Sequence, residues 1–169
     1  MKTARLTLRR MCGDDAAALH VIMSDWQVVR QLGSWPWPPD PAFTQMRCDD
    51  TATHKRDIYG VWLHDDLIGT VGTHNSDLGY CFVADHWGQG FASEACATAL
   101  DGAFADPACD KIGASAWDDN AASMRVLGKL GFVEGQSEIQ HAFARDAPTL
   151  CRTFTLTRAA WQTLRADAQ

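Results

Sequence analysis

The sequence lacks any run of about 18 consecutive apolar residues, the length at which a stretch becomes a candidate to span a membrane. Its first ten residues alternate in polarity and contain no continuous apolar core of the kind found in signal peptides. We therefore expect no membrane partner and a cytoplasmic location.

No pair of cysteines has the C-x-x-C spacing that is typical of zinc sites and redox motifs. The six cysteines are scattered at positions 12, 48, 81, 96, 109 and 151. This scatter argues against a disulfide framework and against a metal site, so we expect no bound metal. Cys81, Cys96 and Cys151 fall within apolar patterns and are predicted to be small buried hydrophobic residues, as in a reducing cytoplasm.

Positive charge is also scarce, because 15 Lys and Arg face 21 Asp and Glu, for a net charge of −6. Nucleic acid is not an expected partner, since proteins that bind it carry a basic surface. An acidic balance would favour an amine that arrives as a cation, although solvated surface charge is the preferred explanation of the balance. A length of 169 residues with 46% hydrophobic residues predicts a single domain over residues 1–169.

Hydrophobic periodicity divides the chain into strands and helices with no linker, repeat or low-complexity tract. Strands are expected over residues 3–10, 58–63, 67–73, 78–83, 111–117, 132–142 and 151–156. Helices are expected over residues 14–32, 43–53, 91–105 and 121–130, with a last helical turn over 157–161. This order predicts an α/β fold in which one sheet carries helices on both faces.

The segment from Leu78 to Leu100 has the pattern of a strand, a turn with Gly88 and Gly90, and an alanine-rich helix. Unpaired N–H groups at a helix N-terminus bind anions, and glycine lets a phosphate approach the backbone, so the segment predicts a diphosphate ligand. A dinucleotide fingerprint fits poorly, because Ser93 stands where its third glycine would be. A G-x-x-x-x-G-K-[ST] phosphate loop is absent from the sequence. A purely structural turn is the remaining alternative.

Three motifs in order, LGY at 78–80, WGQGFASEA at 87–95 and NAASMRVLGKLGF at 120–132, carry a resemblance to a known family. The chain resembles the GNAT superfamily of N-acetyltransferases, and within it the branch of the ribosomal-protein N-terminal acetyltransferases RimJ and RimL. The resemblance implies a single-domain GNAT-like fold, with a mixed, mostly antiparallel sheet that is splayed at its centre and flanked by helices. It also implies acetyl-CoA as co-substrate and, as acceptor, an amine-bearing small molecule or a protein N-terminus. It leaves a homodimer open.

The resemblance also assigns residues to acetyl-CoA. A backbone N–H at Phe82 or Val83 would polarise the thioester carbonyl, and Asn120 would orient the pantetheine arm. The turn that would hold the diphosphate comprises Trp87, Gly88, Gln89, Gly90, Phe91, Ala92 and Ser93. The wider superfamily has Arg or Gln at the position of Trp87. The RimJ and RimL branch has Trp there, as this chain does.

Many superfamily members have, seven residues after the Asn, a Tyr that protonates the departing thiolate, and here that position is Leu127. Ser123 lies four residues earlier and therefore on the same helix face, which makes it the predicted substitute donor. The alternative is that Ser123 only serves the start of the helix.

The general base has five candidates, namely His74, Asp77, Glu94, Glu138 and His141. We predict His74, because it ends a strand next to the cofactor strand and an imidazole is suited to taking up a proton at neutral pH. A turn role for His74, a helix-start role for Glu94 and a water relay to solvent are the alternatives.

Two further expectations concern the acceptor and the activity. Trp26, Trp35 and Trp37 lie within twelve residues and beside four prolines, which predicts either a small core or an aromatic wall over the acceptor site. The resemblance favours the wall. Because Leu127 replaces the usual Tyr, a non-catalytic domain that binds or senses acyl-CoA is the alternative to an enzyme.

Overall fold

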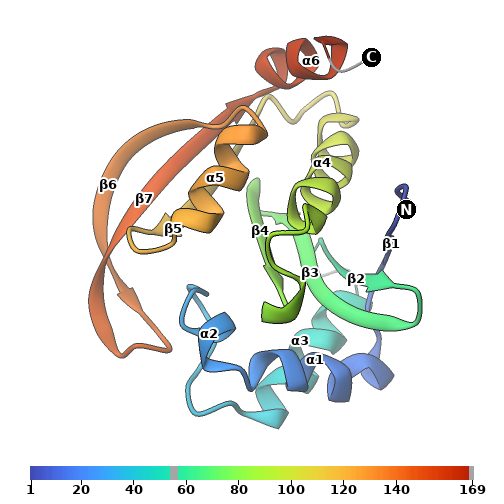
Figure 1. Ribbon diagram of the computed structural model, residues 1–169, viewed down its shortest axis with the longest axis vertical. Coiled ribbons are helices and arrows are strands. Elements are labelled where there is room, and N and C mark those ends of the chain that lie inside the picture. The colour runs from blue at the N-terminus through green and yellow to red at the C-terminus, as the bar shows by residue number, and fades with distance from the viewer. Residues whose placement is uncertain (54–56, 168–169) are drawn as a thin grey trace.

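The computed structural model describes residues 1–53 and 57–167, and its centre is a seven-stranded sheet (Figure 1). The strands are β1 (Thr7–Arg9), β2 (Ile58–Leu63), β3 (Asp66–His74), β4 (Asp77–Phe82), β5 (Lys111–Trp117), β6 (Val133–Ala142) and β7 (Ala147–Thr157). The helices are η1 (Gly13–Asp15), α1 (Ala16–Met23), α2 (Trp26–Val29), α3 (Pro41–Ala52), η2 (Ala84–His86), α4 (Phe91–Phe104), α5 (Ala121–Lys129) and α6 (Arg158–Asp167).

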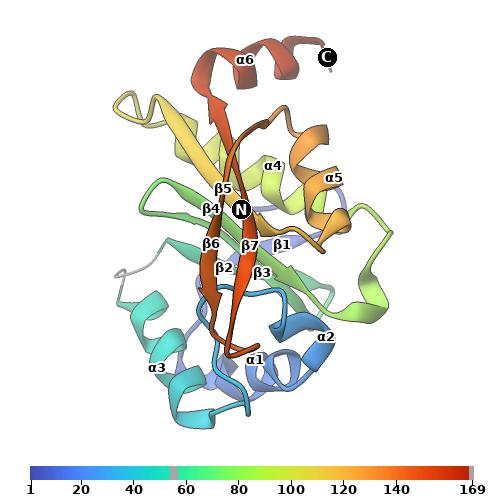
Figure 2. The same cartoon turned by 90° about the vertical axis from the view of Figure 1, so that its left-hand side faces the viewer.

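The sheet has the order β1-β2-β3-β4-β5-β7-β6 and divides between β4 and β5. All neighbouring strands pair antiparallel except β4 and β5, which pair parallel only at Asp77 with Gly113 and at Leu78 with Ala114. Beyond these two pairs the strands diverge, and the long β6–β7 hairpin curves away along one side of the molecule (Figures 1 and 2). The expected sheet, mostly antiparallel and splayed at its centre, is confirmed.

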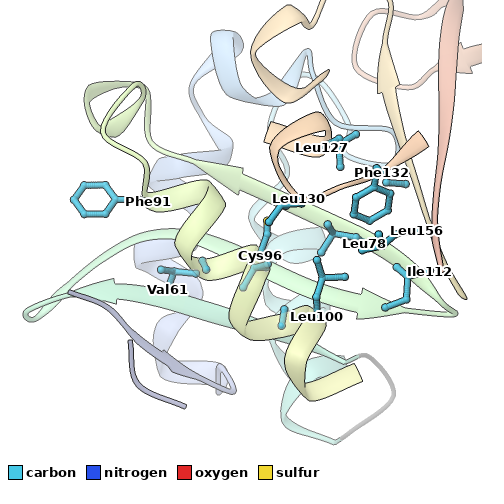
Figure 3. Close-up of a cluster of buried hydrophobic side chains, with 14 of the residues drawn as sticks. Val61, Leu78, Phe91, Cys96, Leu100, Ile112, Leu127, Leu130, Phe132 and Leu156 are labelled. Carbon is cyan, nitrogen blue, oxygen red and sulfur yellow. The ribbon is translucent and has the colours of Figure 1, made fainter. Parts of the chain in front are cut away.

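Successive side chains of a strand point to opposite faces of the sheet. Apolar side chains lie on both faces here, and helices cover both. Leu78 and Phe82 of β4 belong to the core under α4, with Cys96 and Leu100 of that helix. Figure 3 shows this core continuing to Leu127 and Leu156 on the far side of the split. Cys81, between them in β4, belongs instead to the second core, formed with α1 and α2.

Two expected elements near the N-terminus are shorter than predicted. The strand expected over 3–10 is reduced to β1, because Thr3 to Leu6 form a tight turn in which the Thr3 N–H donates to the Leu6 carbonyl (2.9 Å). The helix expected over 14–32 is broken after Met23, because the Asp25 side chain accepts from the Gln27 N–H (2.8 Å) and starts α2 as a new N-cap.

Two other helices are longer than predicted. The helix expected from residue 43 begins at Pro41, since Asp40 caps it and proline is tolerated in the first turn. The last helical turn extends into α6, which runs to Asp167 because buried Trp161 anchors it by an indole hydrogen bond to Asp101 (3.0 Å).

Candidate active site

A cleft of about 590 Å³ occupies the split in the sheet. Its walls come from β4, from the turn between η2 and α4, from Ser115 and Ala116 of β5, and from the first turns of α5. At one end the segment after α2 contributes Gln31, Leu32 and Gly33. The cleft therefore joins the predicted diphosphate turn to the predicted arm-binding strand.

The pairing of β4 with β3 distinguishes the two residues that were predicted to donate a backbone N–H, Phe82 and Val83. The Val83 N–H donates to the Ile68 carbonyl of β3 (2.9 Å), so it is already used. Because hydrogen bonds alternate along an antiparallel pair, the Phe82 N–H points the opposite way, towards the split. Phe82 lines the cleft and Val83 does not. The geometry thus favours Phe82 as the donor to a thioester carbonyl.

The glycine turn has the backbone that the sequence pattern requires. Gly88 and Gly90 have φ angles of 74° and 82°, in the left-handed region that glycine adopts without strain, and Gly90 is the N-cap of α4. A Cβ at Gly88 would meet nothing within 4 Å, so glycine is required there by the backbone angle and leaves the surface open to a ligand. Trp87 fixes the start of the turn, since its indole N–H donates to the Phe82 carbonyl (2.8 Å).

The remaining predicted turn residues divide into two groups. Phe91, Ala92 and Ser93 line the cleft with Trp87, Gly88 and Gly90. Gln89 does not: its side chain donates to the Asp85 carbonyl (3.0 Å), and its own carbonyl accepts from Arg5 (3.1 Å).

Arg5 supports the turn from behind. Its guanidinium pairs with Glu94 (2.7 Å) and lies over the Phe91 ring at 4.3 Å. Thr3 donates a second hydrogen bond to the Glu94 carboxylate. Burial alone would raise the pKa of Glu94, but the hydrogen bonds from Thr3 and Arg5 outweigh it and lower that pKa. Glu94 is therefore a weak base that holds the N-terminal turn against α4.

The start of α5 places Asn120 and Ser123 in the cleft. The Asn120 side-chain oxygen accepts from the Ser123 N–H (3.0 Å), so Asn120 caps the helix and only its amide N–H₂ is left to meet a ligand. Leu127, at the position of the missing tyrosine, is fully buried in the core.

A tyrosine hydroxyl enters the cleft from β4 instead. The Tyr80 hydroxyl lies 2.8 Å from the Ser123 hydroxyl and 3.3 Å from the Ser123 carbonyl oxygen. Burial raises the pKa of the Tyr80 phenol well above its usual value, which keeps it protonated. Sequence reasoning missed Tyr80, although its place in the LGY motif, on the same strand face as Leu78 and Phe82, was a usable signal.

His74 lies outside the cleft. It pairs with Asp77 across a two-residue turn in which Asn75 and Ser76 have φ angles of 53° and 61°. This turn lies at the end of the sheet where β4 and β5 are still paired. Asp77, Glu94, Glu138 and His141 are also absent from the cleft as the described residues define it. A base role for His74 in this cleft is not supported by its position.

Besides Tyr80 and Cys81, the described residues that line the cleft include His86, Asp119, Arg125 and Lys129, which sequence reasoning did not select. His86 packs edge-on against Phe91 beside the glycine turn (5.9 Å). Arg125 and Lys129 add positive charge along α5, which suits a phosphate-bearing ligand.

The predicted tryptophan wall is not found where it was expected. Trp26 and Trp37, each about 40% exposed, pack against each other with ring centroids 5.1 Å apart and planes tilted by 57°, and Trp35 packs against Phe43. Among residues 1–53 and 57–167 the cleft lining includes none of the three. Val28 and Leu32 supply the apolar surface instead.

Within the described part of the chain, no three His, Cys, Asp or Glu side chains are grouped so that they could hold a metal ion. The helices in that part are too short or too polar to cross a membrane.

Comparisons with known proteins agree with this geometry. The family model of the acetyltransferase (GNAT) domain matches residues 5–133. The uncharacterised N-acetyltransferase YoaA of Bacillus subtilis (strain 168) is 29% identical over 170 residues, covering 94% of this chain and 96% of YoaA.

Two solved structures that contain coenzyme A share the fold. Aminoglycoside acetyltransferase AAC(6')-Ib has a TM-score of 0.75 at 19% identity, covering 95% of this chain and 99% of its own. RimL, a ribosomal L7/L12 α-N-protein acetyltransferase, has a TM-score of 0.73 at 17% identity, covering 92% and 95%.

Proposed function

The chain belongs to the GNAT acetyltransferase family and is an acetyl-CoA-dependent N-acetyltransferase, and from this premise we propose that its cleft transfers the acetyl group directly to a primary amine. The acceptor is a protein N-terminus or a small amine, as in the RimJ and RimL branch that the three motifs resemble. The free thiols of the chain suit the cytoplasm.

The observation that carries this proposal is the Phe82 N–H of β4, which points into the split next to a left-handed glycine turn at the start of α4. Such an edge can hold an extended amide-containing arm, and such a helix start can hold a diphosphate. Arg125 and Lys129 would add attraction for the phosphates from the opposite wall. These features fit acetyl-CoA without any metal ligand.

Two of the chemical steps then have a residue in the cleft. The neutral amine nitrogen attacks the thioester carbon as the nucleophile, and the Phe82 N–H stabilises the negative charge that develops on the carbonyl oxygen. The carbon–sulfur bond breaks, and Ser123, held by Tyr80, donates a hydrogen bond to the departing thiolate. The amine gives up one proton and the thiolate gains one, so the protons balance.

Proton removal from the amine is left to water. Asp119 is the carboxylate that lines the cleft within the described residues, and the hydrogen bond from Arg145 together with the charges of Arg145 and Arg30 lowers its pKa, so it is a poor base. We therefore expect kcat/KM to rise with pH along the titration of the acceptor amine itself.

The test is thiol release from acetyl-CoA with a panel of primary amines, measured beside acetyl-CoA affinity. Amine-dependent thiol release that falls in Ser123→Ala supports an enzyme. Tight acetyl-CoA binding without release for any amine would instead favour the non-catalytic acyl-CoA-binding domain.

A further inference from the structure

Asp119 lines the cleft, whereas Arg30 and Arg145, which pair with it, are not among the described lining residues. We assign the acceptor to the part of the cleft next to Asp119, because the glycine turn and β4 would hold the cofactor. Gln31 and Leu32 line this part from the segment after α2, and Asp119 lines it from the turn between β5 and α5. Among the lining residues that the structure describes, Asp119 is the sole carboxylate.

Two arginines form ion pairs with the Asp119 carboxylate. Arg30 pairs with one Asp119 oxygen at 2.7 Å, and Arg145 pairs with the other at 2.9 Å. Both oxygens are thus used, and two positive charges face one negative charge. The cluster keeps an excess of one positive charge.

Arg145 also fixes the cluster across the split in the sheet. It extends from the turn between β6 and β7 and donates to the Arg30 carbonyl (2.8 Å) and to the Gln31 side-chain oxygen (3.0 Å). Its side chain is only 15% exposed, so water and salt screen it less than a surface arginine. The Gln31 side-chain oxygen therefore already accepts from a cation, and the charge of Arg145 next to it disfavours a second ammonium group there.

Arg30 is the accessible member. Its side chain is 38% exposed, and in the described structure its guanidinium makes the single ion pair with Asp119. An arginine has five N–H donors, so Arg30 retains several for an anionic group of the acceptor.

We propose that the cluster of Arg30, Asp119 and Arg145 selects the acceptor by charge, so that the preferred substrate is a primary amine that also carries a carboxylate. Polycationic amines are disfavoured, because no free carboxylate awaits their second ammonium group. This inference rests on the proposed acetyl transfer. It also reverses the expectation from the net charge of −6, because acidic residues elsewhere on the surface act on the cleft only through screening solvent.

The experiment compares kcat/KM for acceptors that differ mainly in charge, at low and high salt. One arm uses free glutamate against its diamide, and another uses the C-terminally amidated dipeptides Ala-Glu and Ala-Lys, so that a carboxylate is present in only one member of each pair. The two arms separate a free amino acid from a peptide N-terminus as the source of the carboxylate. Spermidine and ribostamycin represent polycations. We expect the acidic member of at least one pair to be preferred about tenfold at low salt, with the preference reduced at high salt.

Arg30→Gln removes the accessible charge and should reduce that preference to about threefold or less. Arg165→Gln is the matched control. Arg165, near the C-terminus, also makes an exposed ion pair at 2.7 Å, with Asp101 of α4, and its substitution changes the net charge by the same amount. It should leave the preference unchanged.

Better turnover of spermidine or ribostamycin, or equal loss of preference in both variants, would overturn the charge selection while acetyl transfer still stands. Failure of every amine to accelerate thiol release would overturn the proposed function itself.

Discussion

At the scale of single residues, the two hydroxyls of Tyr80 and Ser123 form a pair that supplies what Leu127 cannot. Ser123 has one proton, and it can donate that proton to a thiolate while accepting from the Tyr80 phenol. The raised pKa of the phenol makes full proton transfer from Tyr80 unfavourable, so the pair acts by hydrogen bonding.

Ser123→Ala should lower kcat by up to about a hundredfold, because a hydrogen bond to a charged group is worth about 1.5–3 kcal/mol, with little change in acetyl-CoA affinity. Tyr80→Phe should lower kcat by about fivefold, the worth of one neutral hydrogen bond of about 1 kcal/mol. Because the two residues act through one contact, the double variant should be no slower than Ser123→Ala. Steady-state kinetics with saturating acceptor measure these effects, and Tyr59→Phe, outside the cleft, is the control. Full activity in Ser123→Ala would show that water or the acceptor supplies the proton.

Gly90→Ala tests whether the glycine turn is a ligand site or only a turn. A side chain at a φ of 82° is strained by about 1–2 kcal/mol, so the free protein should lose stability even before ligand is added. Gly131→Ala, at a φ of 83° after α5 and outside the cleft, carries the same strain. Titration calorimetry should show weaker acetyl-CoA binding only in Gly90→Ala. Equal affinities in the two variants would make Gly90 structural. A valine at position 90 would add more strain, so alanine separates the two effects better.

At the scale of elements, the short N-terminal hairpin acts as a brace for the diphosphate turn. Thr3 and Arg5 belong to it. They form hydrogen bonds with Glu94 and with the Gln89 carbonyl, which lie 84 to 91 residues away in the sequence. The brace holds the turn and the first residues of α4 in place before a ligand arrives, which reduces the ordering cost of binding.

Arg5→Ala should therefore weaken acetyl-CoA binding roughly threefold or more, with a small loss of thermal stability. Arg9→Ala is a close control, because Arg9 is equally exposed, pairs with Asp15 at 2.8 Å and covers the Trp62 ring, away from the cleft. Calorimetry and thermal melts on both variants separate the roles. Identical affinities for acetyl-CoA would remove the brace from the binding site.

At the scale of the whole molecule, the split sheet leaves a cleft between two halves that share the core under α4. The β4–β5 pairing joins them at one end, and the Arg145 cluster joins them at the other. A ligand that fills the cleft contacts both halves, so its binding free energy adds to the stability of the fold.

Acetyl-CoA or coenzyme A should raise the melting temperature, and NAD and ATP should not, since they lack the pantetheine arm that β4 would bind. At a hundred times the dissociation constant the gain is about 2.7 kcal/mol, which corresponds to roughly 5–10 °C for a chain of this size. Differential scanning fluorimetry measures the shift. An unchanged melting temperature with millimolar acetyl-CoA would contradict the cofactor assignment.

The split of the sheet was expected only from the resemblance to the GNAT superfamily. The sequence by itself determined the strand, glycine turn and helix over residues 78–105, the N-cap of α5 at Asn120, and an α/β fold with one sheet. These depend on local physics, namely period-2 and period-3.6 burial, a capping side chain and glycine at positive φ, all of which act within a few residues. Only the tertiary structure decided that the N–H of Phe82 and not that of Val83 points into the split, because that depends on how β3 pairs with β4. The same holds for the contacts of Tyr80 with Ser123, of Arg5 with Glu94 and of Arg145 with Asp119. Each joins side chains that lie far apart in the chain, and no local pattern encodes which partner folding brings within hydrogen-bond distance.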